Sequence, residues 1–213
     1  MKIHKFQGFL NQAKNIVFFG GAGTSTESNI PDFRSAKSGL YEVASKYPYP
    51  PEKIVSKVFF ELHPKIFFEF FRNELVFKDA KPNAAHIALT KLEKMGKLKS
   101  IITQNVDNLH QKSGSKNVLE LHGSVYDNYC IDCNRKYNLD FILDSTKIIP
   151  KCMKCAGIVR PNVVLYGEAP DKRILRRARR AISRADMLII GGTSLEVYPA
   201  AGLINHFKGN NLA

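Results

Sequence analysis

The sequence predicts an α/β protein in which helices cover both faces of a parallel sheet and a smaller unit is inserted into the chain. Four short apolar runs, at residues 16–19, 100–104, 118–121 and 187–190, each lead into glycine or polar residues, which is typical of buried parallel strands. Segments with apolar residues at helical spacing lie between these runs. Four cysteines in two close pairs indicate the inserted unit.

Length and composition favour a globular enzyme. With 213 residues, the chain is long enough for one large domain, or for one domain with a small insert. Hydrophobic residues make up 44% of it, but no apolar run is long enough to span a membrane, and the first residues lack the apolar core of a secretory signal. We therefore expect a cytoplasmic protein with no membrane partner.

The formal charge of +13 favours an anionic partner, which could be a nucleic acid, an acidic protein or an anionic cofactor. The densest basic cluster, residues 171–186, has apolar residues on one helical face and arginines on the rest. No aromatic residues alternate with those arginines, as binding of single strands would require. We expect a solvated helix face there, and no direct binding of nucleic acid.

The first apolar run leads into the stretch GGAGTSTESNIPDFRS, residues 20–35, on which the functional interpretation depends. Gly21 and Gly23 match the start of a dinucleotide-binding fingerprint, in which backbone N–H groups approach a pyrophosphate at a helix N-terminus. Thr26 replaces the third glycine, and no acidic residue ends a second strand about 20 residues later, so the fingerprint is only half present. A plain surface loop after a strand is the alternative.

The residues after this loop predict helices. Residues 38–51 are rich in tyrosine and proline and are expected to form an ordered but mobile loop, a candidate lid. Between Pro51 and Lys78, apolar residues recur at helical intervals, and Pro64 marks the point where one helix stops and another begins. Asn83 is predicted to cap a further helix, which a glycine ends after residue 95.

Polar residues follow the strands at one edge of the predicted sheet. The segment TQNVDNLH supplies Gln104, Asn105 and Asp107, and His122 comes directly after the third strand. Ligands of open α/β sheets bind at the carboxyl ends of the strands, and the turn at residues 191–194 is suited to backbone contact with a phosphate or ribose. A single histidine at a strand end is usually structural, but these neighbours make His122 a catalytic candidate.

The cysteines predict a structural zinc site. Cys130, Cys133, Cys152 and Cys155 form two C-x₂-C pairs with 18 residues between them, which matches a zinc ribbon in number and spacing. Disulfides are not expected in a chain without a secretory signal. Four thiolates leave no open position on the metal for water, so the zinc would hold the fold and take no part in catalysis.

Ordered motifs along nearly the whole chain resemble those of the sirtuins, the NAD-dependent protein deacetylases of the Sir2 family, and most of all the compact bacterial members. Besides the cysteines, these motifs are GAGTSTESNIPDFR, KPNAAH, TQNVDNLH, ELHGS, RPNVVLYGE and GTSLEVYPA. The resemblance implies a Rossmann-like domain of residues 1–35, 79–127 and 158–213. It also implies a small domain made of a helical module with a lid loop, residues 36–78, and the zinc ribbon, residues 128–157.

The resemblance also assigns roles to residues. His122 matches the general base of the family, and Ile30, Asn105 and Asp107 match positions around the nicotinamide. The expected catalytic residues are His122, Asn105 and Asp107. Positions that match the NAD site are Gly21, Ala22, Thr26, Ile30, Asp32, Phe33, Arg34, Gln104, Asn105, Gly192, Thr193 and Ser194. The alternating residues of segment 163–168 predict a strand or an exposed sheet edge. The substrate backbone is expected to add as a strand between two segments, formed by Val164, Tyr166, Gly167 and Glu168 and by Glu196, Val197 and Tyr198.

The implied activity is the removal of acetyl groups from lysine side chains, with NAD and Zn²⁺ as cofactors and acetylated proteins or peptides as partners. In the family, the acetyl oxygen attacks the ribose carbon that bears nicotinamide, and the histidine activates a ribose hydroxyl. The products are free lysine, nicotinamide and O-acetyl-ADP-ribose. A protein ADP-ribosyltransferase with the same NAD site, and a zinc-ribbon protein that binds nucleic acid, are the alternatives.

Two departures from the family pattern affect these expectations. Asn29 stands where the family usually has glycine, and asparagine tolerates a left-handed backbone, so little change is expected. Relatives continue past Ala213 with a strand, an adenine-side loop and a helix, so the Rossmann-like domain is expected to lack its C-terminal strand and helix. We expect a monomer unless the sheet edge exposed in this way associates with a second copy.

Overall fold

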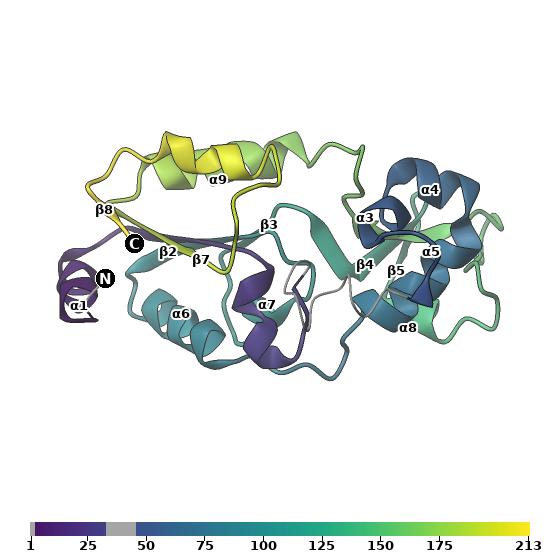
Figure 1. The fold of residues 1–213 in the computed structure, drawn as a ribbon, viewed down its shortest axis with the longest axis horizontal. Helices are drawn as coiled ribbons and strands as arrows, with labels where there is room; N and C mark the ends of the chain where they lie inside the picture. Colours follow the sequence, from purple (N-terminus) through teal and green to yellow (C-terminus); the bar gives the residue numbers. More distant parts are fainter. Residues whose placement is uncertain (1–2, 33–45) are drawn as a thin grey trace.

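The computed structural model describes residues 3–32 and 46–213, and a parallel sheet forms its larger part (Figure 1). The strands follow the order β3-β2-β1-β7-β8, and every neighbouring pair is parallel. Their bounds are Val118–Glu120 (β3), Leu98–Thr103 (β2), Ile16–Gly20 (β1), Met187–Gly191 (β7) and Asn211–Leu212 (β8). All four predicted strands are therefore present.

Helices cover both faces of this sheet, which confirms the predicted fold class. Alternate residues of β1 point to opposite faces, so Ile16 and Phe18 pack in one apolar cluster and Val17 and Phe19 in another. Helices α1 and α6 contribute to the first cluster, whereas α9 and η5 contribute to the second, and Figure 1 shows α6 and α9 on opposite sides of the sheet. The bounds are Ile3–Gln12 (α1), Ala84–Lys94 (α6), Leu109–Lys112 (α7), Lys172–Ser183 (α9) and Ala201–His206 (η5, a 3₁₀ helix).

The predicted helix signals lie where the structure needs them. At the start of α6, the Asn83 side chain accepts hydrogen bonds from the N–H groups of Ala85 and His86, and after its end Gly96 has a φ of +72°. In α9, Ala178 and Ile182 are fully buried. The arginines of this helix lie on its exposed side, as the amphipathic pattern predicted.

The second, smaller unit packs short helices against an antiparallel sheet of order β5-β4-β6. Its core is rich in phenylalanine, and Phe67, Phe68, Phe70 and Phe71 are completely buried. The strands are Gly123–Cys130 (β4), Lys136–Tyr137 (β5) and Val159–Val163 (β6). The helices are Pro51–Ile54 (α3), Lys57–Leu62 (α4), Pro64–Phe70 (α5), Phe71–Leu75 (η4, a π-helical turn) and Leu139–Leu143 (α8). Pro64 separates α4 from α5, as predicted.

Two local predictions differ from the structure. Residues 163–168 were expected to form a strand or sheet edge, but β6 ends at Val163 and a turn follows, in which the Glu168 N–H donates to the Leu165 carbonyl. The dinucleotide-binding fingerprint, half present here, places a helix after its glycines, but two 3₁₀ turns, Ala22–Thr24 (η1) and Thr26–Ser28 (η2), follow β1 in the structure. Asn29 ends η2 with a φ of +60°, the left-handed conformation expected for it.

Within residues 3–32 and 46–213, the helices are too short and too polar to cross a lipid bilayer. The domain limits predicted from the sequence stay a proposal. Because β6 pairs with β4 and its Val159 packs in the phenylalanine-rich core, we propose to count β6 with the smaller unit.

Candidate active site

The site lies where the strand order of the large sheet reverses. The chain proceeds from β1 outward to β2 and β3, and then returns to the other side of β1 to form β7. In register, Gly20 at the end of β1 lies beside Thr103 of β2 and Gly191 of β7, so three strand ends meet at one rim. A reversal of this kind is where open α/β sheets bind their ligands.

Two glycine turns interlock at this rim. The Gly21 N–H donates to the Gly191 carbonyl at 3.2 Å, and the Gly23 N–H donates to the Gly192 carbonyl at 2.9 Å. A Cβ on Gly21 would lie 2.8 Å from the Gly192 oxygen, and one on Gly23 would lie 2.9 Å from the Gly192 Cα. Glycine is needed here because the two backbones touch.

This contact corrects one sequence expectation. The N–H groups of Gly21 and Gly23 were expected to face a pyrophosphate, but both are used to join the turns. What remains open above the joined turns is a surface of small residues, with Gly23, Thr26, Gly192 and Ser194 exposed. A small-residue surface at a strand-order reversal fits a dinucleotide, whose phosphates and riboses need close approach to backbone.

A buried hydroxyl connects the predicted amide and acid. The Ser25 Oγ donates to Asp107 Oδ2 at 2.6 Å and accepts a hydrogen bond from Asn105 Nδ2 at 3.0 Å. The other carboxylate oxygen, Asp107 Oδ1, accepts from the Leu109 N–H at 2.9 Å, and the Asn105 N–H donates to the Thr103 side chain. Ser25 is 1% exposed, so the amide and the carboxylate are held in fixed positions.

The hydrogen bond of His122 defines its tautomer. Its Nδ1 lies 3.0 Å from the Gln104 carbonyl oxygen, and because a carbonyl can only accept, Nδ1 must carry the proton. In the neutral ring, Nε2 therefore holds the lone pair that a base needs. Burial lowers the pKa of His122, although the Gln104 carbonyl partly opposes this effect, so the neutral form prevails at pH 7.

Two further histidines support the rim from behind. The Asn83 Nδ2 donates to the Thr24 carbonyl at 2.8 Å, and its Oδ1 lies 2.9 Å from His86 Nδ1, so the start of α6 is joined to the glycine turn. The His86 and His110 rings lie 4.7 Å apart. Burial and the neighbouring imidazole lower the pKa of His110 to about 3, so this pair is neutral and apolar in character.

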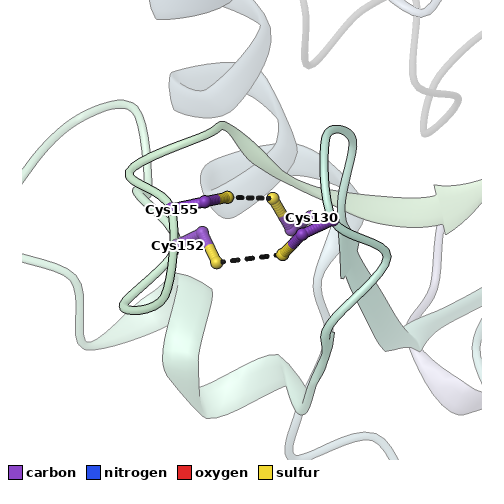
Figure 2. A group of neighbouring side chains, drawn as sticks. Cys130, Cys152 and Cys155 are labelled. Atoms are coloured by element: carbon purple, nitrogen blue, oxygen red, sulfur yellow. Dashed lines mark hydrogen bonds between the residues drawn. The ribbon is translucent and has the colours of Figure 1, made fainter.

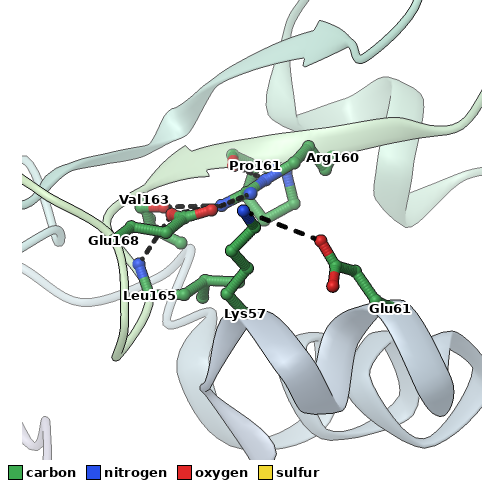
Figure 3. A network of polar contacts seen from close by, with 7 residues as sticks. All are labelled: Lys57, Glu61, Arg160, Pro161, Val163, Leu165 and Glu168. Atoms are coloured by element: carbon green, nitrogen blue, oxygen red, sulfur yellow. Dashed lines mark hydrogen bonds and ion pairs between the residues drawn. The ribbon is translucent and has the colours of Figure 1, made fainter.

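An ion pair organises the first predicted substrate segment, residues 164–168 (Figure 3). The Arg160 guanidinium donates to both oxygens of the Glu168 carboxylate, at 2.6 and 3.1 Å, and also to the Val163 carbonyl at 2.8 Å. Glu168 Oε2 in turn accepts from the Leu165 N–H at 3.0 Å. Glu168 therefore holds the turn from inside.

The backbone of the same segment is mostly occupied. The Val164 N–H donates to the His122 carbonyl, and Tyr166 exchanges hydrogen bonds with Val55 and Lys57 of the helical module. Among the described residues, the Gly167 N–H has no acceptor, and Gly167 has a φ of +89°. A substrate strand that pairs with this segment would find its donor at Gly167.

The second predicted substrate segment follows the β7 turn. Thr193 Oγ1 accepts from the Gln104 side chain at 2.9 Å and from the Leu195 N–H at 3.2 Å, which fixes the turn to the rim. The Ser194 hydroxyl donates to Glu196 at 3.1 Å. Beyond them Tyr198 is 73% exposed, so the end of this segment is open to a partner.

The cysteines converge within the small unit (Figure 2). Their four sulfur atoms all lie within 4.8 Å of one another, with Cys130 and Cys155 at 3.4 Å and Cys133 and Cys152 at 3.6 Å. A tetrahedral zinc with bonds of about 2.3 Å needs sulfurs about 3.8 Å apart, so the donor set fits this metal. The Tyr137 hydroxyl donates to Cys152 Sγ at 3.1 Å.

Comparison with known proteins agrees with this geometry. The sequence model of the Sir2 family matches residues 21–199. The chain belongs to the Sir2 family. It is 59% identical over 212 residues to a protein of Clostridium perfringens named NAD-dependent protein deacetylase, covering 99% of this chain and 86% of the relative. A protein of the same name from Clostridium acetobutylicum is 57% identical over 211 residues, with 99% and 86% covered.

Solved sirtuin structures have the same fold. A complex of Sir2 with a p53 peptide and NAD⁺ matches this sirtuin with a TM-score of 0.86 and 41% identity, covering 100% of this chain and 85% of the other. Sir2Tm bound to a propionylated peptide matches with a TM-score of 0.86 and 39% identity, with the same coverage. The family, the Rossmann-like fold class and the cofactor pair of NAD and zinc are therefore as expected from the sequence.

The rim of this sirtuin brings together most of the predicted cofactor residues. Gly21, Ala22 and Thr26 lie on the first turn, Gln104 and Asn105 on the second, and the β7 turn completes the rim with Gly192, Thr193 and Ser194. Ile30 and Asp32 follow η2 and are half-buried. Phe33, Arg34 and most of the candidate lid lie outside the described residues.

Three site residues were missed in the sequence. Ser25 joins Asn105 to Asp107, Asn83 was assigned only a capping role, and Arg160 holds Glu168. Ser25 lies inside a glycine-rich motif that was interpreted from its glycines. Arg160 lies far from the rim residues in the sequence. No sequence pattern marks Arg160, because its need for a carboxylate follows from its burial, which only the structure shows.

Proposed function

We propose that this sirtuin removes acetyl groups from lysine side chains of proteins, with NAD as co-substrate and with nicotinamide and O-acetyl-ADP-ribose as products. Relatives at 57 and 59% identity are named NAD-dependent protein deacetylases. The observation that carries the proposal is the His122 tautomer, because its Nδ1–H···O=C bond to Gln104 leaves a neutral Nε2 beside the rim that fits NAD. NAD supplies an electrophilic ribose carbon once nicotinamide leaves.

His122 serves as the general base. Its Nε2 accepts a proton from a hydroxyl. Its Nδ1–H continues to donate a hydrogen bond to the Gln104 carbonyl, which prevents the ring from turning. A lowered pKa keeps Nε2 free of protons at neutral pH. The same carbonyl then stabilises the imidazolium that forms, because it already accepts from Nδ1.

Asn105 and Asp107 hold the leaving group. Their common partner Ser25 is almost fully buried, so the amide and carboxylate keep one spacing in the absence of ligand. A carboxamide has both donor and acceptor atoms, which a fixed amide and carboxylate can match. Preorganised groups of this kind lose little freedom when the ligand binds.

The acetylated substrate binds as an extended segment between residues 164–168 and 196–198. The support is the open Gly167 N–H on one side and the exposed Tyr198 on the other. Recognition through backbone hydrogen bonds tolerates many side chains, so the substrate class is defined by the acetyl-lysine and its surroundings. The zinc, held by Cys130, Cys133, Cys152 and Cys155, maintains the small unit and takes no part in the reaction.

One experiment separates this function from its alternatives. The protein is incubated with NAD and an acetylated peptide, and deacetylated peptide, free nicotinamide and ADP-ribosylated protein are measured together. Deacetylated peptide in equal amount to nicotinamide supports the proposal, whereas label transferred to protein supports an ADP-ribosyltransferase. A zinc-ribbon protein that binds nucleic acid would give neither product.

The matched variant is His122→Ala. We expect its deacetylation rate to fall by about 10²-fold or more, the usual loss for a general base, while its Kd for NAD changes only a few-fold. Undiminished turnover in the purified variant would remove His122 from the mechanism. A monomeric state and a cytoplasmic location are further proposals, to be checked by sedimentation and by cell fractionation.

A further inference from the structure

A groove of about 770 Å³ lies between α9 and η5. Leu175, Pro199 and Leu203 form apolar parts of its lining, and Tyr198 stands at one wall. Lys172, Arg176 and Arg179 supply the cationic part. The general base and the cysteine cluster take no part in this groove, and Tyr198 is the one lining residue that the proposed substrate site already uses.

The three cations form one row on α9. They stand at positions i, i+4 and i+7 of the helix and are all exposed. Within the described ranges, no carboxylate forms an ion pair with Lys172, Arg176 or Arg179, whereas Arg173 on the same helix pairs with Asp171 at 3.0 Å. The row therefore carries an uncompensated positive charge.

The groove continues the proposed substrate site. Tyr198 belongs to the second substrate segment and also lines the groove, and its side chain is 73% exposed. A peptide bound along this segment would reach the groove at Tyr198, because this residue belongs to both. The occupant is for this reason expected to be a part of the same polypeptide that carries the acetyl-lysine.

The size of the row limits the ligand. Seven residues of α-helix span about 10 Å. An extended peptide advances about 3.3 Å per residue, so about three residues would lie along the row. One aromatic side chain and a row of this length provide little for a nucleic acid strand, which needs a longer cationic track and several stacking platforms.

We propose that the groove between α9 and η5 binds a short acidic stretch of the acetylated substrate, next to the residues that pair with the strand segments. This inference rests on the proposed deacetylase function and narrows its substrate class to acetyl-lysines with acidic residues on one side. Leu175 and Leu203 contact the aliphatic parts of the bound stretch, and Lys172, Arg176 and Arg179 face its carboxylates.

The test compares acetyl-lysine peptides of one length that carry three glutamates or three glutamines, placed either before or after the acetyl-lysine. The measured quantity is the ratio of kcat/KM for the acidic and the neutral peptide. At low salt we expect a ratio of about 3 to 10 for one of the two placements, because exposed ion pairs contribute modestly and are screened by salt. The double variant Arg176→Ala/Arg179→Ala should bring this ratio close to one.

The matched control is Arg177→Ala/Arg180→Ala, which removes the same charge from the same helix outside the groove. It should keep the ratio of the wild type. A ratio near one in the wild type for both placements, or an equal loss in both double variants, would overturn the inference. It would also be overturned if Arg176 and Arg179 governed binding of a single-stranded oligonucleotide and left the peptide ratio unchanged.

The design separates this inference from the proposed function. If the wild type does not deacetylate even the neutral peptide, the proposed function is wrong, and the same peptides with a fluorescent label still measure binding to the groove. If the acidic peptide then binds more tightly than the neutral peptide, and Arg176 and Arg179 are needed for the difference, the proposed docking site is supported. Equal binding of the acidic and neutral peptides would overturn it.

Discussion

The ion pair between Arg160 and Glu168 makes a quantitative prediction. The two side chains are 7% and 22% exposed, and two hydrogen bonds join them. Glu168→Ala would leave a buried guanidinium without its carboxylate, a change that costs about 3 to 5 kcal/mol in comparable sites. Because Arg160 keeps its hydrogen bond to the Val163 carbonyl, we expect the lower end, about 3 kcal/mol.

The loss should also reach the substrate site. Glu168 accepts the Leu165 N–H and so shapes the turn that presents the Gly167 N–H. Without the carboxylate, the open donor loses its fixed position, and binding of the peptide backbone weakens. We therefore expect KM for the acetylated peptide to rise by about tenfold in Glu168→Ala, whereas KM for NAD stays near that of the wild type.

Urea unfolding followed by circular dichroism measures the stability change, and initial rates at varied peptide concentration measure KM. The matched control is Glu61→Ala. Glu61 lies 3.9 Å from Lys57 in an exposed pair of the same network (Figure 3), so its loss should cost less than about 0.5 kcal/mol. A Glu168→Ala protein within 1 kcal/mol of the wild type, or an equal loss in Glu61→Ala, would refute the reasoning.

The pH dependence of this pair has a definite sign. Burial acts to raise the pKa of Glu168, but the hydrogen bonds from Arg160 and from the Leu165 N–H outweigh it and hold the pKa below its usual range. The stabilisation is therefore complete above the pKa of the unfolded state, about 4.3, and is lost as the pH falls through the lower pKa of the folded state.

Three more outcomes follow from the described contacts. Burial and a neighbouring imidazole lower the pKa of His110 to about 3, so below pH 6.5 the unfolded state binds more protons than the folded state. The free energy of unfolding should therefore fall by about 1.4 kcal/mol per pH unit between pH 6 and 4. Urea titrations of His110→Gln should show a flatter slope. Tyr137→Phe removes the hydrogen-bond donor to Cys152 and should speed zinc release to a chelator by about tenfold. Tyr129→Phe in the same ribbon should leave the release rate unchanged. Equal rates in the two variants would show that the Tyr137 hydroxyl does not support the metal site. Ser25→Ala should lower the free energy of unfolding by about 1 to 3 kcal/mol and reduce nicotinamide release, because the Asn105 amide and the Asp107 carboxylate lose a buried partner. Full activity of the variant would show that the two groups do not need Ser25 to position them.

The sequence determined the large sheet well because its strands are short, apolar and bounded by glycine or polar residues. The runs at residues 16–19 and 187–190 became β1 and β7 with almost the expected limits. The helix capped by Asn83 was also predicted correctly, since caps act through neighbours in sequence. Local rules were sufficient wherever the determining contact was local.

The site was harder to predict because its contacts are distant in sequence. Gly21 and Gly23 were interpreted from the phosphate fingerprint alone, whereas their N–H groups bind carbonyls of a turn that follows 170 residues later in the chain. The prediction of a strand at residues 163–168 was wrong for a different reason, since the pair that decides the turn is only eight residues apart. Alternating residues favoured a strand, but Arg160 fixes Glu168 in a turn, and no local pattern shows that pairing.

The two interlocked glycine turns link the assembly of the site to the synthesis of the chain. Thr24 and Gly191, which share a hydrogen bond, are separated by 167 residues, so the cofactor surface cannot exist while β7 is still inside the ribosome. The small unit and the pair of strands β1 and β2 can fold earlier, because their pairing partners all precede β7 in the sequence. In a series of stalled nascent chains, the ability to retain NAD should appear abruptly, and only once the turn after β7 has emerged.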